Sequence, residues 1–185
     1  MPKTLVLMFH RDSAKSVANA ALFRAAQGVA GVQAIDVQAR YPNGHIDIMT
    51  DAETEAQQVL GAARIVLQFP VQWYGTPAIL KTWQDAVLTR MYYIHAQTEG
   101  ARLVGTPHML AASFGNVAQA YGRDGQNHYS VDEIFTPLKA TARRCGLIWH
   151  PPHLTFSADT LAPAALDRAA QSYASALRDF AAKAA

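Results

Sequence analysis

The sequence has 185 residues, half of them hydrophobic, and a formal net charge of +2. This length predicts a single domain over residues 1–185, because it provides one full-sized core and is too short for two ordinary domains. The basic residues are scattered along the chain and form no run, so the charge pattern excludes the electrostatic footprint of a nucleic-acid-binding protein.

Signals for export, membrane insertion and metal binding are not found in the sequence. No opening stretch joins a basic start to an apolar run and a small-residue cleavage site, and nowhere do about 18 apolar residues follow one another. We therefore expect a soluble, cytoplasmic protein. The only cysteine, Cys145, cannot form an internal disulfide, and no Cys/His cluster has zinc spacing, so we expect a buried thiol and no metal site.

In the first half of the chain, apolar runs of strand length alternate with helical patterns. The expected strands are residues 5–9, 32–37 and 64–69, and the expected helices are residues 16–27 and 51–61, with a third helix from residue 76. Pro70 is expected to stop the third strand. Thr76 and Pro77 resemble a helix start, with Thr as the N-cap and Pro at the first helical position. One face of that helix carries the apolar residues Ile79, Trp83 and Val87.

The second half of the chain continues the alternation. The expected strands are residues 108–114 and 147–156, and Pro151 and Pro152 break the second of them. A helix is expected over residues 130–144, and a last helix has an apolar face formed by Leu166, Ala169, Tyr173, Leu177 and Phe180. Five strands alternating with five helices predict an α/β fold, a parallel sheet with helices on both faces, because parallel strands need right-handed crossover connections.

In such a sheet, ligands bind beyond the carboxyl ends of the strands, at the point where the strand order reverses. For the strand order 2-1-3-4-5, the loops that meet there are residues 10–16, 70–76 and 114–129. The sequence contains no Gly-rich dinucleotide fingerprint, Walker loop, nucleophile elbow or metalloprotease helix motif, so the common phosphate and hydrolase signatures are excluded.

The first of these loops is rich in hydrogen-bond donors and ends at a helix start. His10 opens it, and Ser16 lies where a hydroxyl and free backbone N–H groups would face a phosphate monoester together. Two alternatives stay open, since Ser16 could act only as an N-cap and His10 could be an ordinary loop histidine.

The second loop places two large aromatic residues, Trp73 and Tyr74, between a strand and a helix start. Aromatic side chains held at a strand end favour stacking against a flat ring. The alternative is that Trp73 belongs to the core, which is the usual place for a single tryptophan.

With both loops described, the sequence resembles the NAD(P)H dehydrogenase (quinone) family. These are flavodoxin-like flavoproteins that include the oxidoreductase ancillary proteins of glutathione-gated potassium efflux systems. The block from Phe69 to Trp83 is the most specific part of the resemblance, because it joins a strand end, an aromatic loop and a Pro-started helix in one order. The other matching segments are His10 with residues 16–19, Tyr41-Pro42 with residues 46–48, Tyr121 with residues 127–129, and residues 145–149.

The resemblance implies a flavodoxin-like three-layer sandwich with the strand order 2-1-3-4-5 and a noncovalently bound flavin. The short chain favours FMN over FAD. The flavin phosphate would lie on His10, Ser16, Val17, Ala18 and Asn19, and its ring over Val71, Gln72, Trp73 and Tyr74 and beside Phe114, Gly115, Asn116 and Val117. In the family, a hydride passes from NAD(P)H through the flavin to a quinone-like acceptor in a ping-pong scheme, so the protein mainly positions the cofactor.

The resemblance also implies roles for four further residues. Tyr121 and His128 fall near a Tyr/His pair that would stabilise the charge of the reduced flavin, although Tyr121 could instead cap a loop and His128 lie on the surface. Tyr93 and His95 match positions that line the acceptor pocket from a neighbouring subunit, which implies a homodimer.

At residues 114–117 the chain departs from the family, which often has Thr-Thr-Gly-Gly at this place. Here the residues are Phe-Gly-Asn-Val, and we expect the side chains of Asn116 and Val117 to crowd the flavin.

Two other functions stay open. The chain could be a regulatory subunit that docks on a potassium efflux antiporter at the inner face of the membrane, with weak or no catalysis. A flavodoxin-type electron carrier is disfavoured by the small net charge and by a first loop that is not rich in Ser and Thr.

Overall fold

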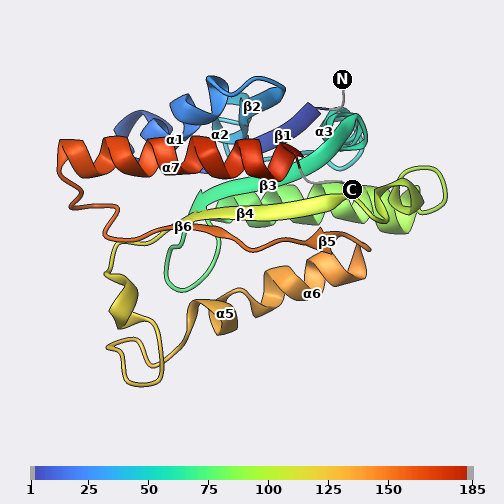
Figure 1. Ribbon diagram of the computed structural model, residues 1–185. Coiled ribbons are helices and arrows are strands. Elements are labelled where there is room, and N and C mark those ends of the chain that lie inside the picture. Colours follow the sequence, from blue (N-terminus) through green and yellow to red (C-terminus); the bar gives the residue numbers. More distant parts are fainter. Residues whose placement is uncertain (1–2, 183–185) are drawn as a thin grey trace.

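The computed structural model describes residues 3–182 and builds them around one parallel sheet (Figure 1). The strands lie in the order β2-β1-β3-β4-β5, and β6 also pairs with β4. Their bounds are β1 Lys3–Met8, β2 Val32–Asp36, β3 Ala62–Pro70, β4 Pro107–Ser113, β5 Ile148–Trp149 and β6 His153–Thr155. The predicted order is confirmed. The last position is divided into β5 and β6 around Pro151 and Pro152, because proline cannot donate to the strand ladder.

Helices cover both faces of this sheet (Figure 1), as the sequence pattern predicted. Their bounds are α1 Ala18–Gln27, α2 Val37–Arg40, α3 Asp51–Leu60, α4 Ala78–Trp83, α5 Val131–Ile134, α6 Thr136–Arg144 and α7 Pro163–Ala182. Successive strand side chains point to opposite faces. In β1, Leu5 and Leu7 therefore pack in the core that includes α3 and α4, whereas Val6 packs in the core that includes α1 and α7.

The start of α4 differs by one position from the predicted one. Pro77 is the N-cap, with an extended ψ of 148°, and the helix begins at Ala78, so the assignment of the N-cap to Thr76 is wrong. The expected apolar face is nevertheless buried, and it continues beyond α4 through two π-helical segments, Gln84–Leu88 and Arg90–Ile94.

Two other helix boundaries also differ from the sequence expectation. α1 begins at Ala18, after a short 3-10 turn over Ser13–Lys15, and not at residue 16. The helix expected over residues 130–144 is divided into α5 and α6 at Phe135, whose ring is buried in the core. Ser130 and Glu133 form a capping box that fixes the start of α5.

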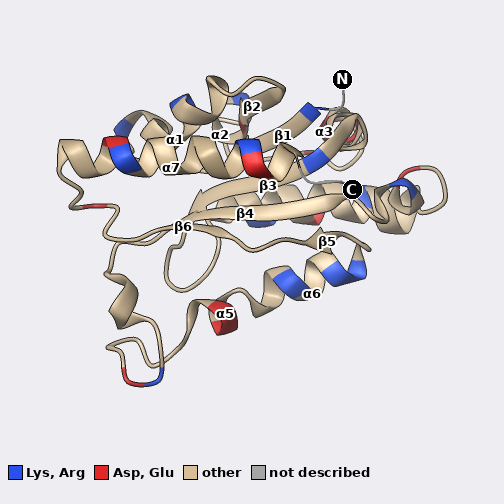
Figure 2. Cartoon of the chain, in the orientation of Figure 1, with Lys and Arg blue, Asp and Glu red and all other residues tan. Residues whose placement is uncertain are grey.

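Charged residues of both signs are spread over most elements, and α6 is the locally basic helix, with Lys139, Arg143 and Arg144 (Figure 2). Cys145, directly after α6, is buried as expected, and burial raises the pKa of its thiol. In the part of the chain that the structure describes, no helix combines the length and apolar character needed to cross a membrane.

Candidate functional site

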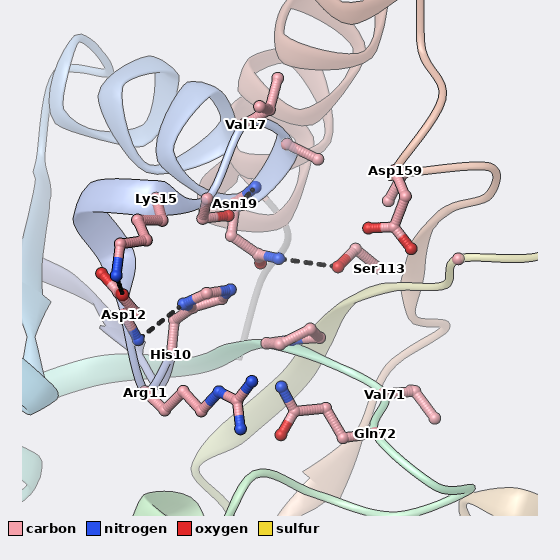
Figure 3. A pocket seen from close by; sticks show the side chains of 15 residues that line it. His10, Arg11, Asp12, Lys15, Val17, Asn19, Val71, Gln72, Ser113 and Asp159 are labelled. Carbon is pink, nitrogen blue, oxygen red and sulfur yellow. Dashed lines mark hydrogen bonds and ion pairs between the residues drawn. The ribbon is translucent and has the colours of Figure 1, made fainter.

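A cavity of about 490 Å³ opens at the carboxyl ends of β1, β3 and β4, in front of α1 (Figure 3). This is the place where the strand order reverses, and the volume lies within the range of roughly 300–1,000 Å³ that is typical of small-molecule sites. The predicted cofactor residues that line it are His10, Ser16, Val17, Ala18, Asn19, Val71, Gln72 and Gly115. The sheet topology thus brings most of the predicted phosphate and ring contacts into one hollow.

His10 is held as a neutral hydrogen-bond donor at the edge of this cavity. The backbone N–H of Asp12 donates to His10 Nδ1 over 3.1 Å, as the dashed line in Figure 3 shows. Burial lowers the pKa of His10 below its ordinary value of 6.5, so the ring is uncharged at neutral pH. With Nδ1 used as an acceptor, the ring proton lies on Nε2, which can donate to a ligand.

Ser16 lies just before α1, whose N-cap is Val17, and it lines the cavity. Its Oγ accepts a hydrogen bond from the backbone N–H of Asn19 over 3.1 Å, which caps the first turn of α1. A hydroxyl group can accept and donate at the same time, so the Ser16 O–H is still able to donate into the cavity that the residue lines. The first N–H groups of α1, which have no partner within the helix, face the same end.

Asn19 connects the start of α1 to the sheet. Its Nδ2 donates to Ser113 Oγ at the end of β4 over 2.8 Å, and the side chain of Gln68 in β3 donates to the Asn19 carbonyl over 2.9 Å. All three residues are buried. Asn19 Oδ1 is buried without a hydrogen-bond partner in the protein, which costs roughly 1–3 kcal/mol unless a ligand donates to it. A ligand with hydroxyl groups therefore fits this wall. We call His10, Ser16, Asn19 and Ser113 the polar anchor.

Sequence reasoning missed several residues that line the same cavity, namely Arg11, Asp12, Lys15, Ser113 and Asp159. The first three lie in the predicted donor-rich loop, where an ion pair joins Lys15 Nζ to Asp12 Oδ2 over 2.8 Å. Asp159 lies in the loop after β6. The prediction that ligands bind at the loops after strands 1, 3 and 4 does not include this loop. A Cβ atom on Gly115 would lie 2.6 Å from Asp159 Oδ2, so the two residues are close neighbours on the cavity wall.

The two adjacent aromatic residues form the tip of a tight hairpin, Gln72–Gly75, which we call the aromatic turn. Gln72 and Gly75 exchange two backbone hydrogen bonds of 3.0 Å. Trp73 and Tyr74 have φ values of 48° and 61°, in the left-handed region that two-residue hairpins normally fill with Asn and Gly. Trp73 is 97% exposed, which excludes the alternative that it belongs to the core. Strained non-glycine backbone conformations cluster at ligand sites, so this turn is a candidate for ligand contact.

A second hollow, of about 260 Å³, lies between the aromatic turn and the loop that follows β4. It shares Val71 and Gly115 with the larger cavity, so the two are adjoining. Its other lining residues are Trp73, Tyr74, Asn116, Tyr121 and Asn127. Burial raises the pKa of Tyr121, so its phenol stays protonated at neutral pH and can donate a hydrogen bond.

The segment after β4 does not place all its predicted residues at these hollows. Phe114 is a core residue, 1% exposed, and its ring packs edge-on against Tyr121 with centroids 4.9 Å apart. Asn116 lines the second hollow, but its side chain forms hydrogen bonds within its own loop. Its Oδ1 accepts from the Val117 N–H over 2.8 Å, and its Nδ2 donates to the Gln126 side chain over 3.2 Å. Val117 is half exposed.

The structure does not bring His128, Tyr93 and His95 to the cavity or to the second hollow of the same chain. His128 is exposed, with a positive φ of 57° and its Nδ1 3.2 Å from the Arg123 carbonyl oxygen. Tyr93 is 77% exposed on the second π-helical segment, and His95 ends that segment. The sequence assigned Tyr93 and His95 to the site of a neighbouring subunit, and that assignment stays a prediction.

Comparisons with known proteins agree with this geometry. The family model described as "Flavodoxin-like fold" matches residues 2–178. The chain is 35% identical to the glutathione-regulated potassium-efflux system ancillary protein KefG of Pectobacterium atrosepticum over 173 residues, covering 93% of this chain and 91% of the relative. It is 34% identical to the uncharacterized NAD(P)H oxidoreductase YrkL of Bacillus subtilis over 149 residues, covering 80% and 82%.

A solved structure also resembles the chain over almost its whole length. The general stress protein 14 of Treponema denticola, in complex with FMN, superposes with a TM-score of 0.85 at 30% sequence identity. The match covers 97% of this chain and 99% of that protein.

Proposed function

Because the chain belongs to the flavodoxin-like family whose model spans residues 2–178, we propose that it is an FMN-dependent NAD(P)H oxidoreductase. Its proposed electron acceptor is a quinone-like molecule. The observation that carries the proposal is the adjoining pair of hollows, one with a polar anchor at a helix start and the other beside an exposed tryptophan. This arrangement suits a ligand with an anionic tail and a flat ring. A relative named as an NAD(P)H oxidoreductase and a neighbour in complex with FMN support the same reading.

The residues present fit FMN. His10 Nε2, the Ser16 hydroxyl and the N–H groups at the start of α1 would hold the phosphate, since all of them are donors at one end of the cavity. The unpartnered Asn19 Oδ1 would accept from a ribityl hydroxyl. When bound, FMN supplies the two-electron hydride chemistry, which no side chain provides.

The aromatic turn would leave one face of the ring site open to solvent, because Trp73 and Tyr74 are exposed. NAD(P)H and the acceptor would use that open face in turn, which is the structural requirement for a ping-pong scheme. We assign the donor to the reduced ring to Tyr121, whose phenol is protonated at neutral pH and lines the second hollow. His128 lies outside that hollow and receives no role within one chain.

The direct test is a titration of the purified protein with FMN, followed by assays of NADH and NADPH oxidation with a simple benzoquinone. We expect a yellow protein with a flavin spectrum and turnover that depends on both substrates. A colourless protein that neither binds added FMN nor oxidises NAD(P)H would contradict the proposal.

The relative named as a potassium-efflux ancillary protein favours a second function that is compatible with the first. In this reading the chain docks on a potassium efflux antiporter as a peripheral subunit, and a homodimer would bring Tyr93 and His95 to the partner's site. Co-purification with a tagged antiporter, and the mass of the free protein by light scattering, test these two points. A monomer that turns over at full rate would remove Tyr93 and His95 from the site.

A further inference from the structure

A side-chain hydrogen bond crosses the second hollow from one wall to the other. The Tyr74 hydroxyl, on the aromatic turn, donates to Asn127 Oδ1 over 3.2 Å, and Asn127 belongs to the loop after β4 on the opposite wall. Neither element is in a helix or a strand of the sheet at this point, so the width of the hollow depends on contacts of this kind.

The backbone of Asn127 belongs to a tightly packed loop. Its backbone N–H donates to the Ala120 carbonyl over 2.9 Å, which closes the loop on itself. The loop is also tightly packed: a Cβ atom on Gly125 would lie 2.5 Å from the Gln119 carbonyl oxygen. The carboxamide of Asn127 is therefore attached to a compact segment rather than to a loose loop.

The wall that Asn127 contacts is, by contrast, strained. Trp73 and Tyr74 both adopt left-handed backbone conformations, which cost non-glycine residues roughly 1–2 kcal/mol each. The Tyr74 hydroxyl is the point at which the opposite wall holds this turn. A hydrogen bond to one of the two strained residues opposes relaxation of the turn, which would carry Trp73 away from the hollow.

Asn127 and Tyr121 line the same hollow, and Tyr74 is the side chain to which Asn127 is hydrogen-bonded. Burial raises the pKa of Tyr121, so its phenol stays protonated beside this contact. A hollow whose two walls are joined at Tyr74 therefore also holds the Tyr121 hydroxyl at its edge.

We propose that Asn127 is a positioning residue that holds Tyr74, and with it the aromatic turn, against the loop after β4 and so fixes the width of the slot for a flat ring. The identification of that ring as a flavin rests on the proposed function, but the contact itself is a property of the protein without a ligand.

The first experiment measures hydrogen exchange in the apoprotein. Asn127→Leu removes the hydrogen bond to Tyr74 at similar size, and we expect the amide of Gly75, which donates to the Gln72 carbonyl, to exchange at least threefold faster. Asn127→Asp keeps the acceptor for Tyr74 and should leave that rate within twofold of wild type. Asp124→Asn, an exposed change in the same loop, is the matched control. An unchanged Gly75 rate in Asn127→Leu would overturn the proposal.

The second experiment is a double-mutant cycle of Tyr74→Phe and Asn127→Leu, read as the dissociation constant of FMN. We expect each single change to weaken FMN binding about fivefold and the pair to weaken it little more than either alone, because both remove the same contact. Asn127→Asp keeps the acceptor for Tyr74, so we expect its dissociation constant for FMN to stay within twofold of wild type.

The two proposals fail in different ways. Additive effects of the two changes on FMN binding would overturn the role of Asn127 even if the wild-type protein is a working reductase. Failure of the wild-type protein to bind FMN would overturn the proposed function, and the exchange measurement on the apoprotein would still decide whether Asn127 holds the aromatic turn.

Discussion

The polar anchor and the aromatic turn stabilise the site in opposite ways. The anchor is cross-linked, and its Asn19 and Ser113 are buried: the Asn19 side chain donates to Ser113 in the sheet, and the Asn19 backbone N–H donates to the Ser16 hydroxyl. The aromatic turn is exposed and strained, with Trp73 97% accessible and two residues at positive φ. Under the proposed function, this difference would let one end hold a ligand tightly while the other keeps a face open for exchange of substrates.

If this division between the two ends is correct, changes at the anchor should lower both protein stability and FMN affinity. Changes at the turn should lower FMN affinity without lowering protein stability. Four variants test the contrast, and they follow from the largest expected effect to the smallest.

Replacing Asn19 by Leu should have the largest effect. The change removes the donor to Ser113 Oγ and the free acceptor on the cavity wall, so we expect FMN affinity to fall about a hundredfold and the free energy of unfolding to fall by roughly 1–3 kcal/mol. Urea unfolding and fluorescence titration measure the two quantities. Ser130→Ala is the control, since loss of that cap should cost about 1 kcal/mol and leave FMN affinity unchanged.

Tyr121→Phe should act on turnover rather than on binding. The variant keeps the ring that packs on Phe114 but loses the hydroxyl donor, so we expect kcat to fall by about tenfold to a hundredfold with FMN affinity within twofold of wild type. Tyr129→Phe, an exposed change in the same loop, should leave kcat unaltered. Equal kcat values for the two variants would remove Tyr121 from the chemistry.

Trp73→Gly is the sharpest test of the contrast, because binding and stability should move in opposite directions. Glycine adopts positive φ without strain, so we expect the free energy of unfolding to rise by about 1 kcal/mol. Loss of ring stacking should weaken FMN binding about tenfold, equivalent to about 1.4 kcal/mol. A variant that loses both stability and affinity would show that the turn is an ordinary structural element.

His10→Gln should give the smallest effect, visible as a change in pH dependence. The pKa of His10 is lowered by burial in the free protein, so the ring is neutral at pH 7 and gains a proton only when the pH falls to that lowered pKa. A bound phosphate favours the charged ring, so lowering the pH from 7.5 to 5.5 should strengthen FMN binding a few-fold more in wild type than in His10→Gln. The titration of the phosphate itself is common to both proteins. Parallel pH profiles would exclude His10 from the phosphate site.

The lowered pKa of His10 also makes the stability of the free protein depend on pH. Because the folded-state pKa of His10 is lowered, its contribution to stability is fully present above 6.5 and is lost as the pH falls from 6.5 toward the folded value. His108 is buried in β4, and burial lowers its pKa to about 4. It therefore adds a larger loss of stability as the pH falls.

The sequence was sufficient to predict the sheet order and the loops that line the cavity and the second hollow. Continuous apolar runs mark β1 and β3 because both faces of each strand are covered. The loops after these strands carry the donors of the anchor and the two aromatic residues, so the rule for ligand position in parallel sheets brings them together.

Other features depend on contacts between distant segments and leave no local pattern. Ser113 and Asp159 reach the cavity only through pairing of β4 with β6 and the course of the chain after it. The left-handed backbone at Trp73 contradicts residue preference and is imposed by the hairpin. The resemblance paired His128 with Tyr121, but within one chain Asn127 lines the hollow beside Tyr121 and His128 does not.

The central claim, that the start of α1 holds the phosphate of a flavin whose ring lies against the aromatic turn, is tested most directly by comparing FMN with riboflavin, which lacks the phosphate. Tryptophan fluorescence during titration of the wild-type protein gives both dissociation constants. We expect FMN to bind at least about a hundredfold more tightly and to quench the exposed Trp73. Equal affinity for the two flavins, or binding without quenching, would contradict the account.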